Sequence, residues 1–167
     1  MVLSDDVHCA LERTVHHPEL LTVPLYEDDL VLVAAPEHRL ARQGATSIED
    51  IGREPLILFD KGSSYNQLIQ GVFRQHGIVP HTLMELDTIE ATKKMVEEGL
   101  GIALLPKVST EREFSQGSLV PVEITNAQMP RRQISLIFRR NRKHTRAVIA
   151  FFMQLAELYA VKIPDAR

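Results

Sequence analysis

Three hydroxyl side chains stand at positions where helices are expected to begin. Ser63 and Ser64 precede one helical pattern, Thr88 precedes another, and Lys61 adds a positive charge close to the first. The start of a helix presents unpaired backbone N–H groups and the positive end of the helix dipole, so it binds small anions readily. These residues therefore predict a site for a small anion. The simpler alternative is that Ser63 and Thr88 only cap their helices, since one such cap stabilises a helix by about 1 kcal/mol.

The chain contains no complete catalytic motif. The stretch Gly62-Ser63-Ser64-Tyr65-Asn66 lacks the closing glycine of a Gly-x-Ser-x-Gly turn. Gly99-Leu100-Gly101 lacks the third glycine of a dinucleotide fingerprint, and no Gly-Lys-Ser/Thr phosphate loop is present. An enzyme would also need an acid or a base at the site, and the acidic cluster nearby is Glu85, Asp87 and Glu90. We therefore expect neither an enzyme nor a bound cofactor.

The residues that commonly bind metals are scattered along the chain. The histidines are His8, His16, His17, His38, His76, His81 and His144. No His-Glu-x-x-His and no Cys-x-x-Cys motif brings them into a metal-binding spacing, so we expect no metal site. Cys9 lies in an expected strand, where a small buried side chain is a better interpretation than a reactive thiol.

One segment near the C-terminus is rich in basic side chains without an acid among them. Its basic residues are Arg131, Arg132, Arg139, Arg140, Arg142, Lys143 and Arg146. Such a stripe could contact nucleic-acid phosphates. It lacks interleaved aromatic residues beyond Phe138, and an apolar strand interrupts it. A solvated strand end and turn before a helix is therefore the favoured interpretation.

Length, composition and charge place the chain among globular proteins. It has 167 residues, 44% of them hydrophobic and 25% charged, and its formal net charge is −3. That length fits one ordinary domain or two small lobes. A single cysteine excludes an intrachain disulfide and favours a reducing compartment. No signal peptide is visible and no apolar run approaches the roughly 18–20 residues that cross a bilayer, so a cytoplasmic protein without a membrane partner is expected.

The pattern of apolar residues indicates strands that alternate with helices. Strands are expected at residues 7–11, 29–35, 55–59, 82–86, 101–106, 119–122 and 134–138. Helices are expected as a short turn at 48–51, between Ser63 and Gly77, between Thr88 and Gly99, and at 145–159. The run 29–35 is nearly continuously apolar, as in a strand that is buried on both faces. This alternation predicts an α/β fold with mixed, mostly parallel pairing.

Two segments resemble the effector-binding region of LysR-type transcriptional regulators. Residues 25–41, which end in Pro36-Glu37-His38-Arg39-Leu40-Ala41, resemble the crossover segment between the two effector lobes of that family. The run Val96-Glu97-Glu98-Gly99-Leu100-Gly101-Ile102-Ala103-Leu104-Leu105-Pro106 resembles its helix–glycine–strand signature. The order and spacing of these segments, the capped helices between them and the final strand and helix also fit. The resemblance covers about residues 7–159.

The resemblance implies a bilobed, periplasmic-binding-protein-like (type 2) fold. Residues 1–35 and 128–167 would form a partial first effector-binding lobe, and residues 36–127 would form the second lobe. The family's DNA-binding helix-turn-helix, its linker helix and the opening strand–helix pairs of the first lobe do not precede Val7. We therefore expect the first lobe to be incomplete, with open sheet edges beside residues 7–11 and 30–33 that invite pairing with another chain.

The same resemblance implies a function in transcription regulation. The domain would bind a small, anionic effector between its lobes and control a transcription factor, with DNA bound only by a helix-turn-helix absent from this chain. This chain's share of the effector site would be Lys61, Gly62, Ser63, Ser64, Thr88, Gly101 and Ile102. Effector domains of the family usually pair, so a homodimer is open to this chain. The alternative is a solute-binding protein of the same fold, which would need an export signal and two complete lobes.

Overall fold

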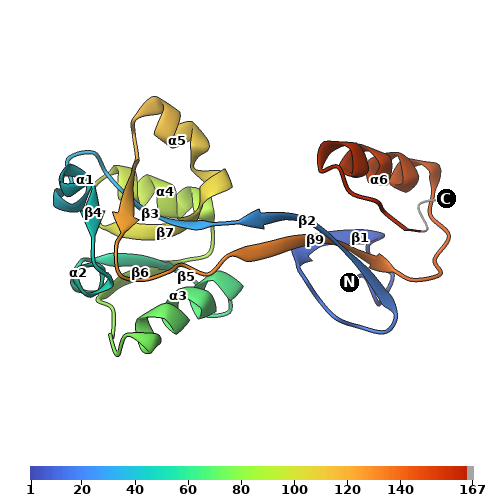
Figure 1. The fold of residues 1–167 in the computed structure, drawn as a ribbon, viewed down its shortest axis with the longest axis horizontal. Helices are drawn as coiled ribbons and strands as arrows, with labels where there is room; N and C mark the ends of the chain where they lie inside the picture. The colour runs from blue at the N-terminus through green and yellow to red at the C-terminus, as the bar shows by residue number, and fades with distance from the viewer. Residues whose placement is uncertain (165–167) are drawn as a thin grey trace. The chain divides into compact units, whose positions relative to one another are not determined.

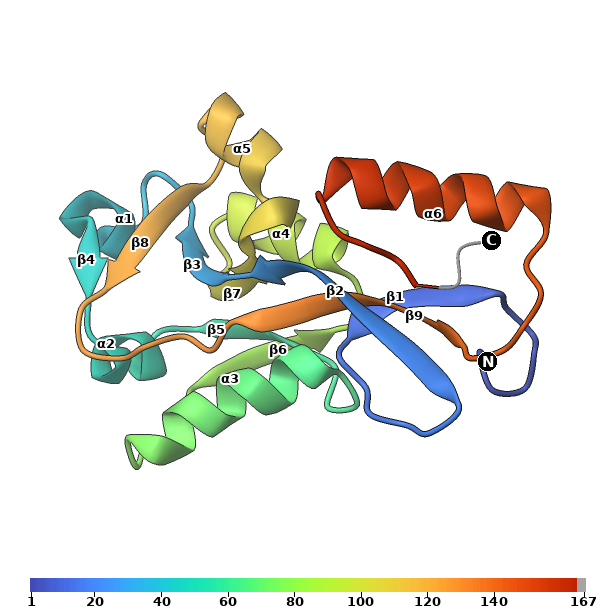
Figure 2. The ribbon, with the colours of Figure 1, turned by 45° about the vertical axis from the view of Figure 1, so that its right-hand side comes forward.

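The computed structural model describes residues 1–164, and the chain forms two compact units (Figures 1 and 2). The first unit contains residues 1–28 and the chain from Arg132 onward, and the second contains Asp29–Arg131. The chain therefore passes from one unit to the other twice, and the second unit is one continuous segment.

The first unit is built on a three-stranded antiparallel sheet in the order β1-β9-β2. Its strands are β1 (Cys9–Arg13), β2 (Leu20–Asp28) and β9 (Arg132–Arg139). Helix α6 (Arg146–Leu158) begins after Thr145, whose hydroxyl accepts a hydrogen bond from the N–H of Val148. Its Phe152 packs against Phe138 of β9, so one face of the sheet is covered by this helix.

The second unit is built on a six-stranded sheet in the order β4-β8-β3-β7-β5-β6. Its strands are β3 (Leu30–Ala34), β4 (Ala45–Thr46), β5 (Leu56–Phe59), β6 (Thr82–Leu86), β7 (Ile102–Pro106) and β8 (Val120–Ile124). Its helices are α1 (Arg39–Gln43), α2 (Ile48–Arg53), α3 (Ser64–Gln75), α4 (Ile89–Glu97), the 3₁₀ turn η1 (Lys107–Ser109) and α5 (Glu111–Gln116). Figures 1 and 2 show α4 and α5 on one face of this sheet and α3 on the other.

The expected α/β class with mixed pairing is confirmed. Within the six-stranded sheet, β5 is parallel to β6 and to β7, and β4 is parallel to β8. Only β3, which carries the chain into this unit, is antiparallel to its neighbours β7 and β8. The sheet of the first unit is antiparallel throughout, so the parallel majority belongs to the second unit.

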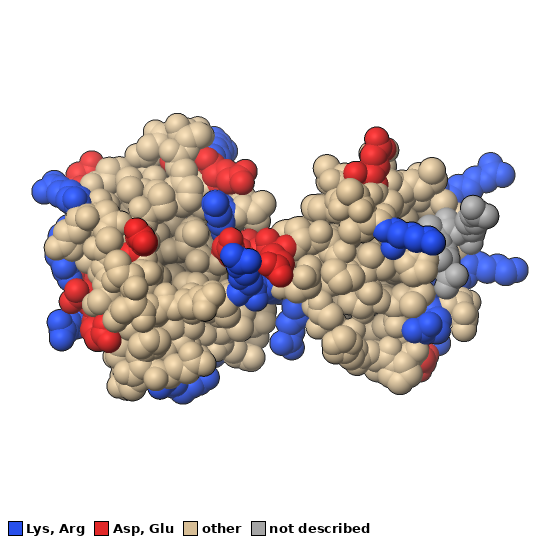
Figure 3. Space-filling model, in the orientation of Figure 1, with Lys and Arg blue, Asp and Glu red and all other residues tan. Residues whose placement is uncertain are grey.

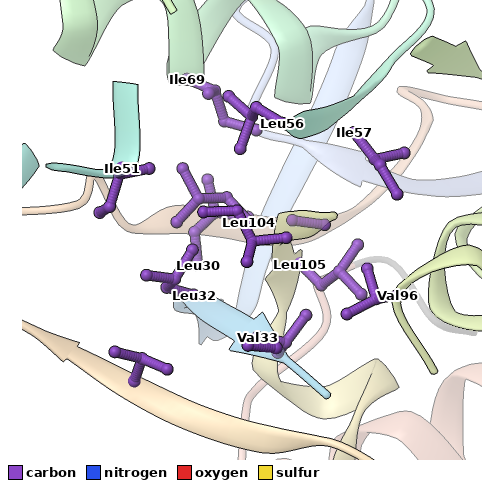
Figure 4. Packing of buried hydrophobic residues seen from close by; sticks show 14 of the residues in the cluster. Leu30, Leu32, Val33, Ile51, Leu56, Ile57, Ile69, Val96, Leu104 and Leu105 are labelled. Carbon is purple, nitrogen blue, oxygen red and sulfur yellow. The ribbon is translucent and has the colours of Figure 1, made fainter. Parts of the chain in front are cut away.

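The hydrophobic core of the second unit lies around its three central strands (Figure 4). Leu32 and Val33 of β3, Ile57 of β5, and Leu104 and Leu105 of β7 are almost completely buried. These strands are apolar along their whole length because helices cover both faces of the sheet. Burying each such side chain contributes roughly 1.5–3 kcal/mol, which makes these strands the main source of the unit's stability.

The two compact units divide at different residues from those expected for the lobes. The units divide after residues 28 and 131, whereas the lobe boundaries expected from the sequence, after residues 35 and 127, stay a prediction. The reason is the position of β3, which pairs with β7 and β8 inside the second unit. For the same reason the expectation of an open edge at 30–33 is wrong, because β3 is an interior strand. That the first unit is a partial effector-binding lobe stays a prediction.

Several elements of the structure were not predicted from the pattern of apolar residues. Strand β2 has no counterpart among the strands expected from the sequence, although its second half lies in the segment that resembles the crossover of the LysR family. The structure accommodates Pro24 in a strand at the sheet edge, with a register shift between Pro24 and Tyr26. The expected first strand lies two residues later along the chain, as β1. The short elements α1, β4, η1 and α5 were also not expected.

His38, in the stretch Pro36–Leu40, has a defined structural role at the start of α1. Its Nδ1 atom accepts a hydrogen bond from the N–H of Leu40 at 3.2 Å and thereby caps α1. Because Nδ1 is the acceptor, the proton of the neutral ring is on Nε2, which lies 3.3 Å from Oε2 of Glu54. Arg39 donates to the other oxygen of Glu54 at 2.6 Å. Glu54 thus holds both His38 and Arg39 in place near the start of the second unit.

A buried ion pair joins α4 to α5 on one face of the six-stranded sheet. Nζ of Lys93 lies 3.0 Å from Oε1 of Glu113, and both side chains are about nine-tenths buried. Lys93 also donates to the carbonyl of Ser109 at 3.0 Å and contacts Glu90 at 2.9 Å. Burial, the largest single influence, raises the pKa of Glu113, but the hydrogen bond and the charge of Lys93 together with a backbone hydrogen bond lower that pKa overall. The pair therefore stays ionised and holds the two helices together.

Replacing one partner of this pair should destabilise the second unit strongly. Lys93→Met leaves the Glu113 carboxylate buried without its cation, which costs about 3–5 kcal/mol. The double variant Lys93→Met/Glu113→Leu should recover most of that loss, because no buried charge remains. Urea unfolding followed by circular dichroism measures both. Lys94→Met, one residue along α4 with an exposed side chain paired to Glu97, is the control and should have a much smaller effect.

The contribution of the pair should also depend on pH with a defined sign. The lowered pKa of Glu113 gives stability that is present above the usual carboxyl value of 4.5 and is lost as pH falls through the folded-state pKa. For Lys93, burial lowers the pKa, but its hydrogen bonds to Glu90 and Glu113 raise it overall, so its contribution is lost only at alkaline pH. The stability difference between Lys93→Met and the unchanged chain should shrink as pH falls, because burial without the cation raises the pKa of Glu113 in the variant, and protonation then removes the buried charge. A difference that grew in acid would contradict the ion-pair account.

Candidate functional site

Two helices begin at the same edge of the six-stranded sheet. Strands β5 and β6 are parallel neighbours whose last residues, Phe59 and Leu86, lie opposite each other. The N–H of Asp60 donates to the carbonyl of Leu86 at 2.9 Å and ties the two strand ends together. Helices α3 and α4 start within a few residues of these ends. The expected pairing of two helix starts therefore exists, and a parallel strand pair produces it.

Several hydrogen bonds between neighbouring residues hold the start of α3 in place. The Asp60 carboxylate accepts from the N–H of Gly62 at 2.8 Å, and the Asp60 carbonyl accepts from the N–H of Ser63 at 2.8 Å. The hydroxyl of Ser63 accepts from the N–H of Tyr65 at 3.2 Å. Asn66 is buried and donates its side-chain amide to the carbonyl of Phe59. This turn therefore presents the first N–H groups of α3 in a fixed direction.

The start of α4 is capped in the same way. The hydroxyl of Thr88 accepts from the N–H of Ala91 at 3.2 Å. The hydroxyl of Thr92, which is completely buried, donates to the carbonyl of Thr88 at 3.0 Å. Ser63 and Thr88 are thus both caps, as the simpler alternative required. Capping occupies their oxygen as an acceptor, but each hydroxyl still carries a proton that it can donate to an anion.

Charge of both signs surrounds these helix starts. Lys61 is 83% exposed, and its Nζ lies 3.8 Å from Oε1 of Glu85. Asp60 and Asp87 are also exposed near the two strand ends. The edge therefore has no excess of positive side chains, and a bound anion would depend chiefly on backbone N–H groups and hydroxyl protons.

Two of the expected site residues lie elsewhere. Ile102 pairs with Leu56 at the beginning of β5, three residues or about 10 Å from the strand end at Phe59. Its N–H donates to the carbonyl of Pro55 at 2.9 Å, and its side chain is completely buried. A Cβ on Gly101 would lie 2.3 Å from that carbonyl oxygen, so close packing of the strands requires glycine there. The structure therefore brings Lys61, Gly62, Ser63, Ser64 and Thr88 to one edge and leaves Gly101 and Ile102 at the other. A ligand role for any of these residues stays a prediction.

Lys107 is a candidate that the sequence patterns did not reveal. It follows Pro106 at the carboxyl end of β7, and its N–H donates to the carbonyl of Asp29 at 2.8 Å. β7 leads into η1 and α5, and β5 leads into α3 on the opposite face of the sheet (Figure 2). Adjacent strands whose connections leave to opposite faces mark the point where open α/β sheets bind ligands, outside the carboxyl ends. The Gly99–Pro106 pattern predicted this strand correctly. The expected site residues Gly101 and Ile102 lie at its beginning, whereas the candidate Lys107 follows its end.

The structure offers little else for chemistry. Within residues 1–164, no three side chains of the metal-binding types form a group that could hold an ion. None of the helices in that range is long and apolar enough to span a bilayer. Two open hollows, of about 600 Å³ near His16 and His17 and about 490 Å³ over β3 and β8, are lined by none of the expected site residues.

Part of the basic segment near the C-terminus is paired with nearby acids. Arg132 pairs with Glu12, and Arg142 pairs with Asp5 at 3.0 Å. Arg139 bridges Asp5 at 2.9 Å and Glu19 at 3.1 Å. Figure 3 shows that the basic side chains visible on the first unit are separated by other residues and do not form one continuous basic area. These pairings support the interpretation of a solvated strand end over a nucleic-acid surface.

Comparison with solved structures identifies the fold. The regulatory domain of CcmR from Synechocystis PCC6803, in complex with 2-PG, matches 95% of this chain and 76% of its own, with a TM-score of 0.82 and 20% identity. The effector-binding domain of QuiR in complex with shikimate matches 95% of this chain and 75% of its own, with a TM-score of 0.78 and 22% identity. The expected type 2 periplasmic-binding-protein-like fold is therefore confirmed.

Comparison of sequences identifies the family. A probable RuBisCO transcriptional regulator of Cyanophora paradoxa is 31% identical over 153 residues, which cover 89% of this chain and 47% of that protein. The chain spans about half the length of the curated relatives that it matches. The family model for the LysR substrate binding domain matches residues 1–160. This chain therefore belongs to the LysR substrate-binding domain family, the effector-binding part of LysR-type transcriptional regulators.

Proposed function

We propose that the chain senses a small organic anion at the carboxyl edge of the parallel strands in the second unit. The observation that carries this proposal is the switch between β5 and β7, where the start of α3 follows one strand and Lys107 follows the other. The N–H groups and dipole of the twelve-residue α3 stabilise negative charge at that point. Lys61, just before α3, and Lys107, just after β7, would each add a positive charge.

The class of ligand agrees with what two structural relatives bind. CcmR is described in complex with 2-PG and QuiR in complex with shikimate, and both molecules are small organic acids. A carboxylate or phosphate is the kind of group that capped helix starts accept. We therefore propose an organic acid for this chain, bound by Gly62, Ser63, Ser64 and Lys107, with Thr88 at the neighbouring helix start.

The proposed site lies where the chain enters and leaves the second unit. Leu30, at the start of β3, pairs with Pro106 at the end of β7. Arg131, the last residue of the unit, has its Nε 3.1 Å from Oδ1 of Asp29, the first residue. A ligand at this edge would therefore act beside both crossing segments. It could shift a conformational equilibrium only by its difference in affinity for the alternative arrangements.

The role in the whole regulator follows from the family. We propose that ligand binding by this chain controls a DNA-binding helix-turn-helix elsewhere in a longer protein, in the cytoplasm. We also propose that the chain does not catalyse a reaction, since its relatives are transcription regulators and the hydroxyls at the site serve as helix caps.

A negative charge introduced at the helix cap, without loss of the cap itself, should weaken ligand binding selectively. Aspartate caps helices about as well as serine, so Ser63→Asp should keep α3 intact. The new carboxylate would occupy the anion site and repel the ligand, which should weaken binding by at least about tenfold. Calorimetric titration with shikimate, 2-phosphoglycolate (2-PG) and other small organic acids measures the affinity. Thermal unfolding verifies that the variant is folded.

Ser47 provides the matched control for this substitution. It caps α2 by accepting from the N–H of Asp50 at 3.2 Å, so Ser47→Asp makes the same change at another helix start of the same unit. Its affinity for the ligand should stay within about twofold of the unchanged chain. Equal losses in both variants, or no binding of any acid by the unchanged chain, would reject the proposed site.

Lys107 should contribute to affinity through its charge. Lys107→Gln removes the positive side chain at the end of β7 and leaves the backbone hydrogen bond to Asp29 in place. We expect binding to weaken by about three- to tenfold, and the salt dependence of binding to decrease, because one screened attraction is lost. The same change at the exposed Lys143 of the first unit should leave affinity and salt dependence unchanged. An identical response in both variants would place the anion away from β7.

A further inference from the structure

Tyr65 is the second residue of α3, and its side chain leans back toward the start of that helix. Long side chains in a helix point toward its N-terminus. The ring of Tyr65 accordingly packs on the ring of Phe59, the last residue of β5, with 5.2 Å between the ring centroids and 34° between the planes. Phe59 itself is almost completely buried. The ring of Tyr65 therefore lies at the carboxyl edge of the sheet, where α3 begins.

Two hydrogen bonds fix the part of the helix that carries this ring. The side-chain amide of Asn66 donates to the carbonyl of Phe59, so the first turn of α3 is tied to the strand end on which the ring rests. The N–H of Tyr65 donates to the hydroxyl of Ser63 at 3.2 Å. A side chain that is already held in place loses little conformational freedom when a ligand contacts it. Tyr65 is partly exposed, so part of its ring is available for such a contact.

An unused backbone N–H group lies next to this ring along the chain. The N–H groups of Gly62, Ser63 and Tyr65 each donate to a neighbouring residue, whereas that of Ser64 donates to no residue among 1–164. Ser64 and Tyr65 are adjacent, and successive Cα atoms are about 3.8 Å apart. A carboxylate bound by the N–H of Ser64 would therefore lie close to the tyrosine ring, and the rest of the acid would extend beside that ring.

We propose that Tyr65 determines which organic acids the second unit prefers, and that it selects acids whose carboxylate is attached to a flat, unsaturated ring. This proposal rests on the proposed anion site at the start of α3. The carboxylate would bind the N–H of Ser64, and the ring of the ligand would stack on the exposed part of the Tyr65 ring. Such contacts between rings add about two- to tenfold in affinity beyond the area that they bury. A compact acid such as acetate would fill only the anion site.

Three acids with one carboxylate each separate the effect of the ring from that of the charge. Benzoate has a flat ring, cyclohexanecarboxylate has a puckered ring with as many carbon atoms, and acetate has no ring. Calorimetric or NMR titration of the unchanged chain should show the highest affinity for benzoate, at least about threefold above that for cyclohexanecarboxylate.

Substitutions of Tyr65 should change this preference in a defined way. Tyr65→Phe keeps the flat ring and should preserve the ratio of the two affinities within about twofold. Tyr65→Ala should reduce the ratio to about one and leave the affinity for acetate within about twofold of the unchanged chain. Tyr65→Leu keeps an apolar side chain without a flat ring, so it should lower the ratio in the same way if Tyr65→Ala does not fold.

Phe114→Ala is the matched control, because it removes another partly buried ring of the same unit, on α5. It should leave the preference for benzoate unchanged, and thermal unfolding verifies that each variant is folded. A preference that persists in Tyr65→Ala and Tyr65→Leu, or that Phe114→Ala also removes, would overturn the role of Tyr65. Equal weakening of all three acids by Tyr65→Ala would overturn it too, because a merely structural role predicts that result.

The variant Ser63→Asp separates this proposal from the one on which it rests. It should weaken the binding of all three acids to a similar extent, since each depends on the same anion site. Unchanged binding in Ser63→Asp, or no binding of any of the three acids by the unchanged chain, would reject the anion site and the role of Tyr65 together. Loss of binding in Ser63→Asp with an unaltered ratio in Tyr65→Ala would reject only the role of Tyr65.

Discussion

The parallel alignment of β5 with β6 and β7 is the constraint on which the second unit depends. It is set at one end by the contact between Gly101 and the carbonyl of Pro55, where any Cβ would come within 2.3 Å of the oxygen. It is set at the other end by the hydrogen bond from Asp60 to Leu86. Because the strands are held in this register, α3 and α4 begin at one edge and Lys107 joins them there. A shifted register would separate these groups although every local element remained intact.

The electrostatics of this edge suit a small ligand better than a large one. Backbone N–H groups and the helix dipole act within the first turn of a helix, so they stabilise one carboxylate or phosphate at short range. The nearby acids Asp60, Glu85 and Asp87 prevent a broad positive field. In the first unit, three of the arginines, Arg132, Arg139 and Arg142, are paired with Glu12, Asp5 and Glu19. The proposed preference for a small organic acid would therefore depend on geometry more than on net charge.

The two units differ in how completely they bury their sheets. In the second unit helices cover both faces, and its central strands are buried along their length. In the described part of the first unit, residues 1–28 and 132–164, three strands share one helix, and a small cluster around Val2, Leu20 and Ile137 lies on the opposite face. A sheet of this size has little core of its own to stabilise it. Exposed apolar side chains are found on both units, for example Leu11 and Leu158 on the first and Val79 and Val108 on the second.

The sequence by itself determined the class, the family and the parts that depend on local signals. The continuous apolar runs of β3, β5 and β7 and the caps Ser63 and Thr88 were readable because strand burial and helix capping involve residues close together in the chain. Only the tertiary structure decided which ends of those elements meet. It placed Ile102 beside Leu56 instead of beside the helix starts, made a strand of β2 in spite of Pro24, and assigned β3 to the second unit. Each of these outcomes depends on the pairing of strands that are distant in sequence. The partner and register of a strand cannot be predicted from the residues of that strand alone.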